Sequence, residues 1–143
     1  MKKLTHREET LLLDAAQTVR QNSYSPYSGF KVGAALLTRK GNIYAGTNIE
    51  NAAYGSTICA ERSAVFAAVS AGERCFRAVA LITPKIDGVL FCSPCGSCRQ
   101  VMSEFMSPDT PLLLAVLDGN TRKVYRKKLK DFMPYPFDKF KEK

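Results

Sequence analysis

Cys59-Ala60-Glu61 and, about one βαβ unit later, Pro94-Cys95-Gly96-Ser97-Cys98 bring three thiols and one carboxylate into a single pattern. A catalytic zinc ion is tetrahedral, takes thiolate ligands readily and keeps one of its four positions open for water. Three cysteines with a neighbouring carboxylate fit that arrangement. We therefore predict that Cys59, Cys95 and Cys98 bind Zn²⁺, with one ion per subunit.

Both halves of the pattern lie where the chain is expected to enter a helix. Ser93 and Pro94 suit the N-cap and the first helical position, because proline has no N–H to lose there. After Cys59, apolar residues keep helical spacing until Gly72, which is predicted to end that helix. Two helix N-termini would then point at one metal ion, and their partial positive charge favours the thiolate form of the ligands.

Two charged residues directly follow the first thiol. Three thiolates on a dication leave a net negative site, in which bound water is less acidic and a strong local base is useful. We predict that Glu61 removes a proton from the zinc-bound water. Arg62 is predicted to offset the thiolate charge from behind the ligands.

The remaining cysteines leave one alternative open. With Cys92 added, the chain could build a closed structural site of four cysteines, although such a site has no use for Glu61. We expect Cys92 to be a buried strand residue and Cys75 to be a small core residue. The single histidine, His6, is expected to be a solvated helix residue and not a ligand.

Further motifs around the ligands make the chain resemble a known family. In order, they are SPYSGFKVGAAL at 25–36, NIENA at 48–52, YG at 54–55, TICAER at 57–62 and SPCGSCRQV at 93–101. Together they resemble the short, homotetrameric cytidine deaminases that act on free nucleosides. The likeness covers nearly the whole chain, and its cysteine and glutamate spacing is that of zinc deaminases.

The resemblance implies roles for residues outside the zinc set. Phe30 would pack beside the bound nucleoside, while Asn48 and Glu50 would hydrogen-bond the ribose hydroxyls. These are suitable chemical types, because an amide and a carboxylate two apart on a strand share one face and both can pair with hydroxyls. The backbone N–H of Ala60 would help to hold the pyrimidine.

The resemblance also implies that neighbouring subunits complete each site. Ala52 and Tyr54 would come from one neighbour, and Phe137 would enter the site of another. Pro136 departs from the small residue usual before that phenylalanine, and the alternative is a Phe137 packed against its own core. A homotetramer with shared active sites is thus expected.

The implied reaction is the zinc-dependent hydrolytic deamination of cytidine and 2′-deoxycytidine to uridine and 2′-deoxyuridine, with loss of ammonia, in pyrimidine salvage. Glu61 would act first as base and then as acid, since the proton taken from water is delivered to N3 as C4 is attacked. Three alternatives stay open: a deaminase of RNA or another polynucleotide, a drug deaminase of the blasticidin type, and a nonenzymatic zinc module.

Composition agrees with one compact enzyme subunit. The 143 residues, 45% of them hydrophobic, suit a single domain over 1–143. Polar residues 5–9 argue against a signal peptide, no apolar run approaches membrane-spanning length, and an odd number of cysteines indicates a reducing, cytoplasmic setting. The net charge of +8 is concentrated in the C-terminal quarter, so we predict a solvated edge and a small-molecule nucleoside substrate, with no nucleic-acid or membrane partner.

The overall pattern predicts an α/β fold with three layers, α/β/α, like that of the cytidine deaminases. Thr5 and Glu8 form a capping-box pattern ahead of an amphipathic helix. A mixed five-stranded sheet is predicted from strands at 31–38, 42–48, 77–83, 112–117 and 123–126. The last two should be antiparallel, because residues 118–122 are enough for a hairpin and too few for a parallel crossover. The resemblance assigns that arrangement to deaminases of free nucleosides.

Overall fold

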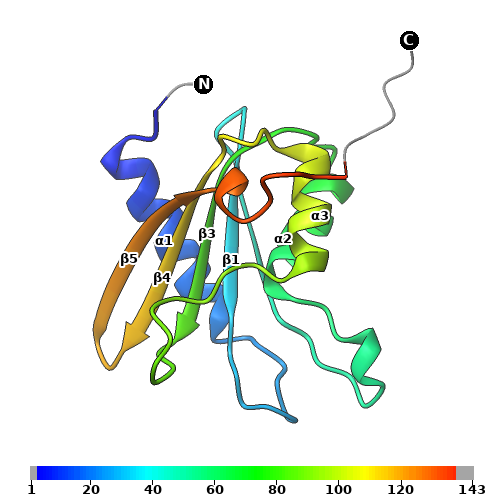
Figure 1. The fold of residues 1–143 in the computed structure, drawn as a ribbon, viewed down its shortest axis with the longest axis vertical. Helices are drawn as coiled ribbons and strands as arrows, with labels where there is room; N and C mark the ends of the chain where they lie inside the picture. The colour runs from blue at the N-terminus through cyan, green and yellow to red at the C-terminus, as the bar shows by residue number, and fades with distance from the viewer. Residues whose placement is uncertain (1–2, 138–143) are drawn as a thin grey trace.

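A single mixed sheet organises the computed structural model, which describes residues 3–137 (Figure 1). In chain order its strands are β1 (Gly33–Thr38), β2 (Ile43–Thr47), β3 (Phe76–Pro84), β4 (Pro111–Asp118) and β5 (Thr121–Lys128). They lie in the order β2-β1-β3-β4-β5, and only the β3–β4 pair of this sheet is parallel. The predicted mixed sheet with antiparallel last strands is confirmed, and each predicted strand lies within two residues of the observed one.

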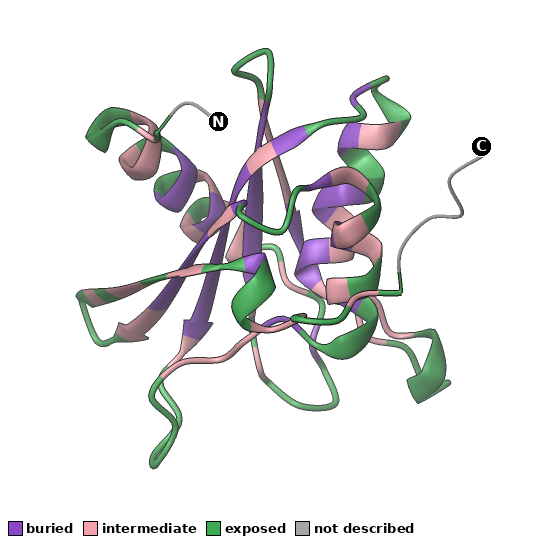
Figure 2. Cartoon of the chain, turned by 45° about the horizontal axis from the view of Figure 1, so that its top comes forward, coloured by how far each residue is buried: buried purple, intermediate pink, exposed green. Residues whose placement is uncertain are grey.

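Helices cover both faces of this sheet. The helix α1 (His6–Arg20) packs on one face, and α2 (Ala60–Ser70) and α3 (Gly96–Phe105) lie on the other (Figure 1). Alternate residues of β1 therefore enter two separate cores: Ala34 and Leu36 pack on the α2–α3 side, whereas Ala35 and Leu37 pack on the α1 side. All of β1 is buried for this reason, as the centre of Figure 2 shows. The predicted three-layer α/β/α fold is confirmed.

The N-terminus of α1 is closed by the predicted capping box. The hydroxyl of Thr5 accepts a hydrogen bond from the backbone N–H of Glu8 at 3.2 Å, and the Glu8 carboxylate accepts from the Thr5 N–H at 2.9 Å. These reciprocal bonds satisfy two of the backbone donors that a helix N-terminus leaves unpaired. His6 is the first residue of α1 and is exposed, as predicted.

The position of α2 depends on a glycine of the sheet. A Cβ atom on Gly46 of β2 would lie 2.3 Å from the backbone nitrogen of Ala64, so only glycine lets the helix lie directly on the strand. At the other end, Gly72 follows α2 with a φ of 94°, which confirms it as the residue that ends the helix. The N-terminus of α2 is thereby fixed over the end of β2.

The prediction for the start of α3 is wrong. The helix begins at Gly96 and its N-cap is Cys95, so Ser93 and Pro94 lie in the preceding extended segment. The Arg99 side chain holds that segment in place by donating to the Pro94 carbonyl at 2.7 Å and to the Ser93 hydroxyl at 3.0 Å. The N-cap position of α3 is therefore occupied by the thiol of Cys95.

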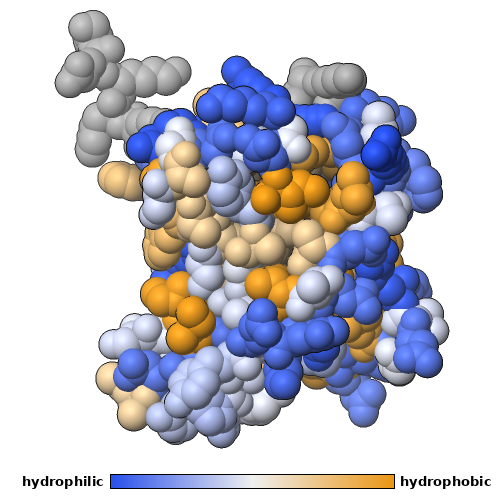
Figure 3. Space-filling view, turned by 180° about the vertical axis from the view of Figure 1, so that it is seen from behind, coloured by the Kyte–Doolittle hydropathy of each residue, from blue (hydrophilic) through white to orange (hydrophobic). Residues whose placement is uncertain are grey.

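Much of the basic C-terminal quarter is paired with acidic side chains. Arg122 of β5 contacts Asp14 at 2.8 Å, and Arg126 contacts Glu9 at 2.6 Å, which ties the edge strand to α1. The basic residues beyond 137 lie outside the described part of the chain. Seen from behind, hydrophilic and apolar residues are interspersed on the surface (Figure 3). Within residues 3–137, no helix is long and apolar enough to cross a membrane.

Candidate metal centre and active site

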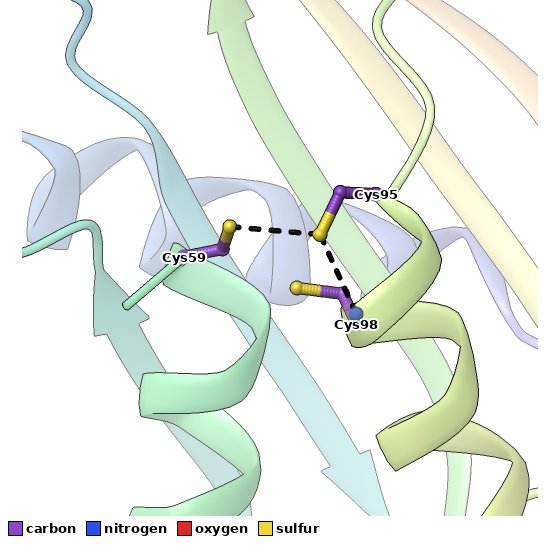
Figure 4. A group of neighbouring side chains, drawn as sticks. All are labelled: Cys59, Cys95 and Cys98. Carbon is purple, nitrogen blue, oxygen red and sulfur yellow. Dashed lines mark hydrogen bonds between the residues drawn. The ribbon is translucent and has the colours of Figure 1, made fainter. Parts of the chain in front are cut away.

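Three thiols meet where α2 and α3 begin (Figure 4). Cys59 is the N-cap of α2, Cys95 is the N-cap of α3, and Cys98 lies in the first turn of α3. Their sulfur atoms all lie within 4.8 Å of one another, and those of Cys59 and Cys95 are 3.8 Å apart. Sulfurs bound about 2.3 Å from a tetrahedral zinc ion are themselves about 3.8 Å apart. The three thiols therefore fit zinc, and the prediction that two helix N-termini bring their thiols together is confirmed.

Cys92 does not belong to this cluster. Among the described residues, the group able to hold a metal ion consists of the three thiols at the helix starts. Cys92 is half-buried in the irregular segment between β3 and α3, so its prediction as a buried strand residue is wrong. The closed site of four cysteines is not formed.

The electrostatics of the cluster favour a thiolate at Cys59. A hydrogen bond from the Cys98 thiol lowers the pKa of Cys59 to about 5, and Arg62 contributes in the same direction through Nη2, which lies 3.5 Å from the sulfur. The same bond to Cys59, followed by burial, raises the pKa of Cys98. Arg62 thus lies behind the ligands, as predicted, and its Nε is buried without a hydrogen-bond partner among residues 3–137.

Glu61 lies in the first turn of α2 with only 4% of its surface exposed. Burial raises the pKa of its carboxyl group to about 7, and the negative charge of Cys59 acts in the same direction. A carboxyl group with a pKa near neutrality can both accept and return a proton at physiological pH. These are the properties that the predicted base and acid requires.

A cavity of about 310 Å³ opens beside the thiols and Glu61. Its lining includes most residues that the resemblance places around a nucleoside, namely Phe30, Asn48, Glu50 and Ala60. The volume lies at the lower end of the range of small-molecule sites, which suits one nucleoside. Ser28, Thr57 and Thr83 also line the cavity, although no role in the site is predicted for them from the sequence.

Asn48 and Glu50 reach the cavity by a different route from the one predicted. The strand β2 ends at Thr47, so the argument that they share one face of a strand is wrong. Between them, Ile49 exchanges two backbone hydrogen bonds with Ile58, at 2.9 and 3.0 Å, which keeps the chain extended past the strand end. Both side chains consequently line the same cavity.

The three residues expected to serve neighbouring subunits do not line this cavity. Ala52 is exposed, Tyr54 is 75% exposed in a short 3₁₀ helix (Tyr54–Ser56), and Phe137 is 71% exposed. The alternative in which Phe137 packs against its own core is therefore wrong. Its backbone carbonyl accepts a hydrogen bond from Gln100 of α3 at 3.0 Å, which leaves the ring on the surface.

A larger hollow, of about 1010 Å³, lies away from these thiols, beside the β1–β2 turn and the start of β3. Arg39, Arg74 and Cys75 are among its lining residues, and within the described chain it contains no group of three metal ligands. The expectation that Cys75 is a core residue is wrong. Cys75 is exposed because the next residue, Phe76, takes the inward position at the start of β3.

Comparisons with known proteins place these observations in a family. Residues 6–113 match the family model of the cytidine and deoxycytidylate deaminase zinc-binding region. A cytidine deaminase from Sporosarcina psychrophila is 45% identical over 128 residues, which cover 90% of each chain. Another, from Halalkalibacterium halodurans, is 44% identical over 82% of this chain and 86% of its own length.

Solved structures agree with the sequence relatives. The crystal structure of a cytidine deaminase from Burkholderia pseudomallei has a TM-score of 0.81 and 41% identity, and it covers 94% of this chain and 100% of its own. The cytidine deaminase of Mycobacterium tuberculosis has a TM-score of 0.72 and 32% identity, covering 91% of this chain and 97% of its own. The fold is thus similar to that of cytidine deaminases of known structure.

Proposed function

The chain belongs to the cytidine and deoxycytidylate deaminase family, and from this we propose that its cavity deaminates free cytidine and 2′-deoxycytidine. The products are uridine and 2′-deoxyuridine, with ammonia. One observation supports this most strongly: the buried Glu61 carboxyl group shares a cavity with thiols at zinc-binding spacing. A zinc module that only stabilises the fold would need neither the carboxyl group nor the cavity.

The residues of the cluster have separate tasks in this reaction. Cys59, Cys95 and Cys98 would hold the zinc ion, which when bound would act as a Lewis acid and make water a nucleophile near neutral pH. Glu61 accepts the proton of that water and delivers it to N3 of the pyrimidine as oxygen adds to C4. Glu61 would then take the proton of the new C4 hydroxyl and pass it to the amino nitrogen, so that the C4–N bond breaks, ammonia leaves and the carbonyl of the uracil ring remains.

The other cavity residues bind and orient the nucleoside. Phe30 packs beside it, and Asn48 and Glu50 pair with the hydroxyls of the sugar. The backbone N–H of Ala60, the first residue of α2, has no partner within its own helix and is free to bind the pyrimidine. These residues therefore bind both the sugar and the base of the substrate.

We also propose that subunits share their active sites in a homotetramer. Cys95 is exposed although it is a metal ligand, and Tyr54 and Phe137 present aromatic rings to solvent. Contact with other copies of the chain would cover these groups and complete the cavity. A fully active monomer, measured by sedimentation and turnover at the same protein concentration, would contradict this assembly.

Two features favour free nucleosides over polynucleotides. A tight turn at Gly119 and Asn120 joins β4 to β5, which is the antiparallel arrangement of free-nucleoside deaminases. In addition, the basic side chains Arg122 and Arg126 are engaged by acidic partners on α1. A role in pyrimidine salvage in the cytoplasm follows from the substrate and from the reduced thiols that the metal requires.

The proposal is tested by offering the zinc-loaded protein four substrates separately: cytidine, 2′-deoxycytidine, blasticidin S and a single-stranded RNA that contains cytidine. Loss of ultraviolet absorbance and release of ammonia report deamination. We expect turnover of both nucleosides and little of the other two. Faster turnover of the RNA or of blasticidin S would overturn the assignment to free nucleosides.

A further inference from the structure

One carboxylate of the cavity is held by the loop that faces it. Oε1 of Glu50 accepts hydrogen bonds from the backbone N–H groups of Tyr27, at 3.0 Å, and Ser28, at 3.1 Å. Oε2 accepts a third bond from the hydroxyl of Ser28, at 2.7 Å. Bonds to an ionised acceptor are short and strong, so these contacts fix the direction in which the carboxylate points.

These contacts leave Glu50 with little spare capacity. A carboxylate has about four acceptor positions, two on each oxygen. Two backbone donors occupy Oε1, and the Ser28 hydroxyl occupies one position on Oε2. The open position is therefore on the oxygen that Ser28 holds, and it has room for one hydroxyl group of a ligand.

The same hydroxyl also connects Glu50 to the aromatic wall of the cavity. Oγ of Ser28 accepts a hydrogen bond from the backbone N–H of Phe30 at 3.0 Å, so its single proton is directed to Glu50. Gly29, with a φ of 67°, makes the turn that brings the Phe30 N–H over this hydroxyl. Ser28 is thus the shared partner of the carboxylate and of the backbone that bears the ring.

We propose that Ser28 is a positioning residue for the sugar site, which aims the open acceptor position of Glu50 at one hydroxyl of the nucleoside. The inference rests on the proposed function, because it takes Glu50 to bind the sugar. Ser28 itself lines the cavity, and its effect on binding passes through the carboxylate.

The loop has a second anchor that does not involve Ser28. The Asn48 side chain donates to the carbonyl of Phe30 at 2.7 Å and accepts from the N–H of Val32 at 3.0 Å. Asn48 is buried, so this anchor is shielded from water. Removing the Ser28 hydroxyl should therefore leave the loop folded and the two backbone bonds to Oε1 in place, while Oε2 loses the partner that fixes its direction.

The kinetic test compares the parent, Ser28→Ala and Ser28→Thr proteins on cytidine and on 2′,3′-dideoxycytidine, which lacks the 2′- and 3′-hydroxyls of the sugar. We expect Ser28→Ala to raise KM for cytidine about tenfold, with a smaller change in kcat, because an aimed bond to a charged group is lost. Turnover of dideoxycytidine should change little. Ser28→Thr keeps the hydroxyl and should restore most of the affinity for cytidine.

A second measurement does not depend on turnover. The hydrogen bond from the Ser28 side chain is the main cause that lowers the pKa of the Glu50 carboxyl group, so Ser28→Ala should raise that pKa toward its usual value. Carbon-13 NMR of the carboxyl group follows the titration directly. An unchanged pKa would show that Ser28 does not hold the carboxylate and would overturn the proposal.

Two further outcomes separate failure of this proposal from failure of the proposed function. If Ser28→Ala raises KM for cytidine by the same factor in a Glu50→Ala protein as in the parent, Ser28 acts only through the loop and the proposal is wrong. If Glu50→Ala leaves the preference for cytidine over dideoxycytidine unchanged, Glu50 does not bind the sugar. That second result overturns the proposed role of Glu50 and, with it, that of Ser28.

Discussion

The N-cap position serves one purpose in α1 and another in α2 and α3. Thr5 caps α1 with an oxygen that accepts from the helix, and Glu8 returns the bond. At the corresponding positions α2 and α3 have Cys59, which makes no side-chain cap bond, and Cys95, whose sulfur accepts at 3.5 Å. An oxygen cap contributes about 1 kcal/mol to stability, so the two metal-binding helices give up local stability for ligands.

Packing and metal binding compensate for the weaker caps. The inward faces of α2 and α3 contain fully buried residues, among them Val65 and Met102. A bound zinc ion adds its own binding free energy to that of the folded chain. We therefore expect changes at the α1 cap to affect stability alone, and changes at the α2 and α3 caps to affect metal binding and turnover first.

The largest effect is expected from Cys95→Ser, because serine is a better helix cap and a poor zinc ligand. Zinc affinity should fall more than about a hundredfold, and turnover should fall with it, while α3 stays formed. Zinc per chain after dialysis, turnover and far-ultraviolet circular dichroism measure the three quantities. A protein that kept its zinc and its activity would break the distinction between the two kinds of cap.

A smaller effect is expected from Arg62→Gln, which removes the positive charge behind Cys59. Zinc affinity should fall by about ten- to a hundredfold, as for other residues that contact a metal ligand. Competition with a chelator measures this affinity. Arg7→Gln, on the exposed face of α1, removes the same charge elsewhere and should leave the affinity unchanged. Equal losses in both variants would mean that net charge alone is responsible.

Thr5→Ala tests the other side of the comparison. Loss of the cap oxygen should lower the free energy of unfolding by about 1 kcal/mol and leave kcat unchanged. Chemical denaturation of the zinc-loaded protein measures the stability, and Thr5→Ser, which keeps the oxygen, serves as the control. A fall in kcat at unchanged stability would show that α1 is coupled to the site.

The smallest effect concerns an exposed ion-pair group at the C-terminal edge. Lys130 and Lys128 hold the pKa of Asp109 at about 2 in the folded chain, below its usual value near 4. Because the folded pKa is the lower one, the group stabilises the fold above about pH 4 and loses that contribution as the pH falls through about 2. The difference in melting temperature between the parent and Asp109→Asn should therefore shrink over this range. A difference that stayed constant would contradict the assigned pKa.

Features with local spacing were predictable from the sequence. The Thr5 and Glu8 capping box and the β4–β5 turn depend on residues a few positions apart. Cys59 and Cys95 lie 36 positions apart, but the zinc ligands lie in two short motifs, one with Cys59 and one with Cys95 and Cys98, so they were also predictable. The start of α3 was mispredicted because Pro94 suits a first helical position, and no local pattern reveals that Arg99 holds it outside the helix. The contact of Ser28 with Glu50 joins residues 22 positions apart, and it could not be predicted because it forms only when the chain is folded.

The most direct test of the account is the zinc content and cytidine turnover of Glu61→Ala, measured on the same sample beside the parent protein. We predict one zinc ion per chain in both proteins, and turnover only in the parent, since the thiols bind the metal and the carboxyl group moves the proton. Near-normal turnover in Glu61→Ala would contradict the assigned mechanism. Loss of zinc from Glu61→Ala would instead show that the carboxylate is needed to hold the metal.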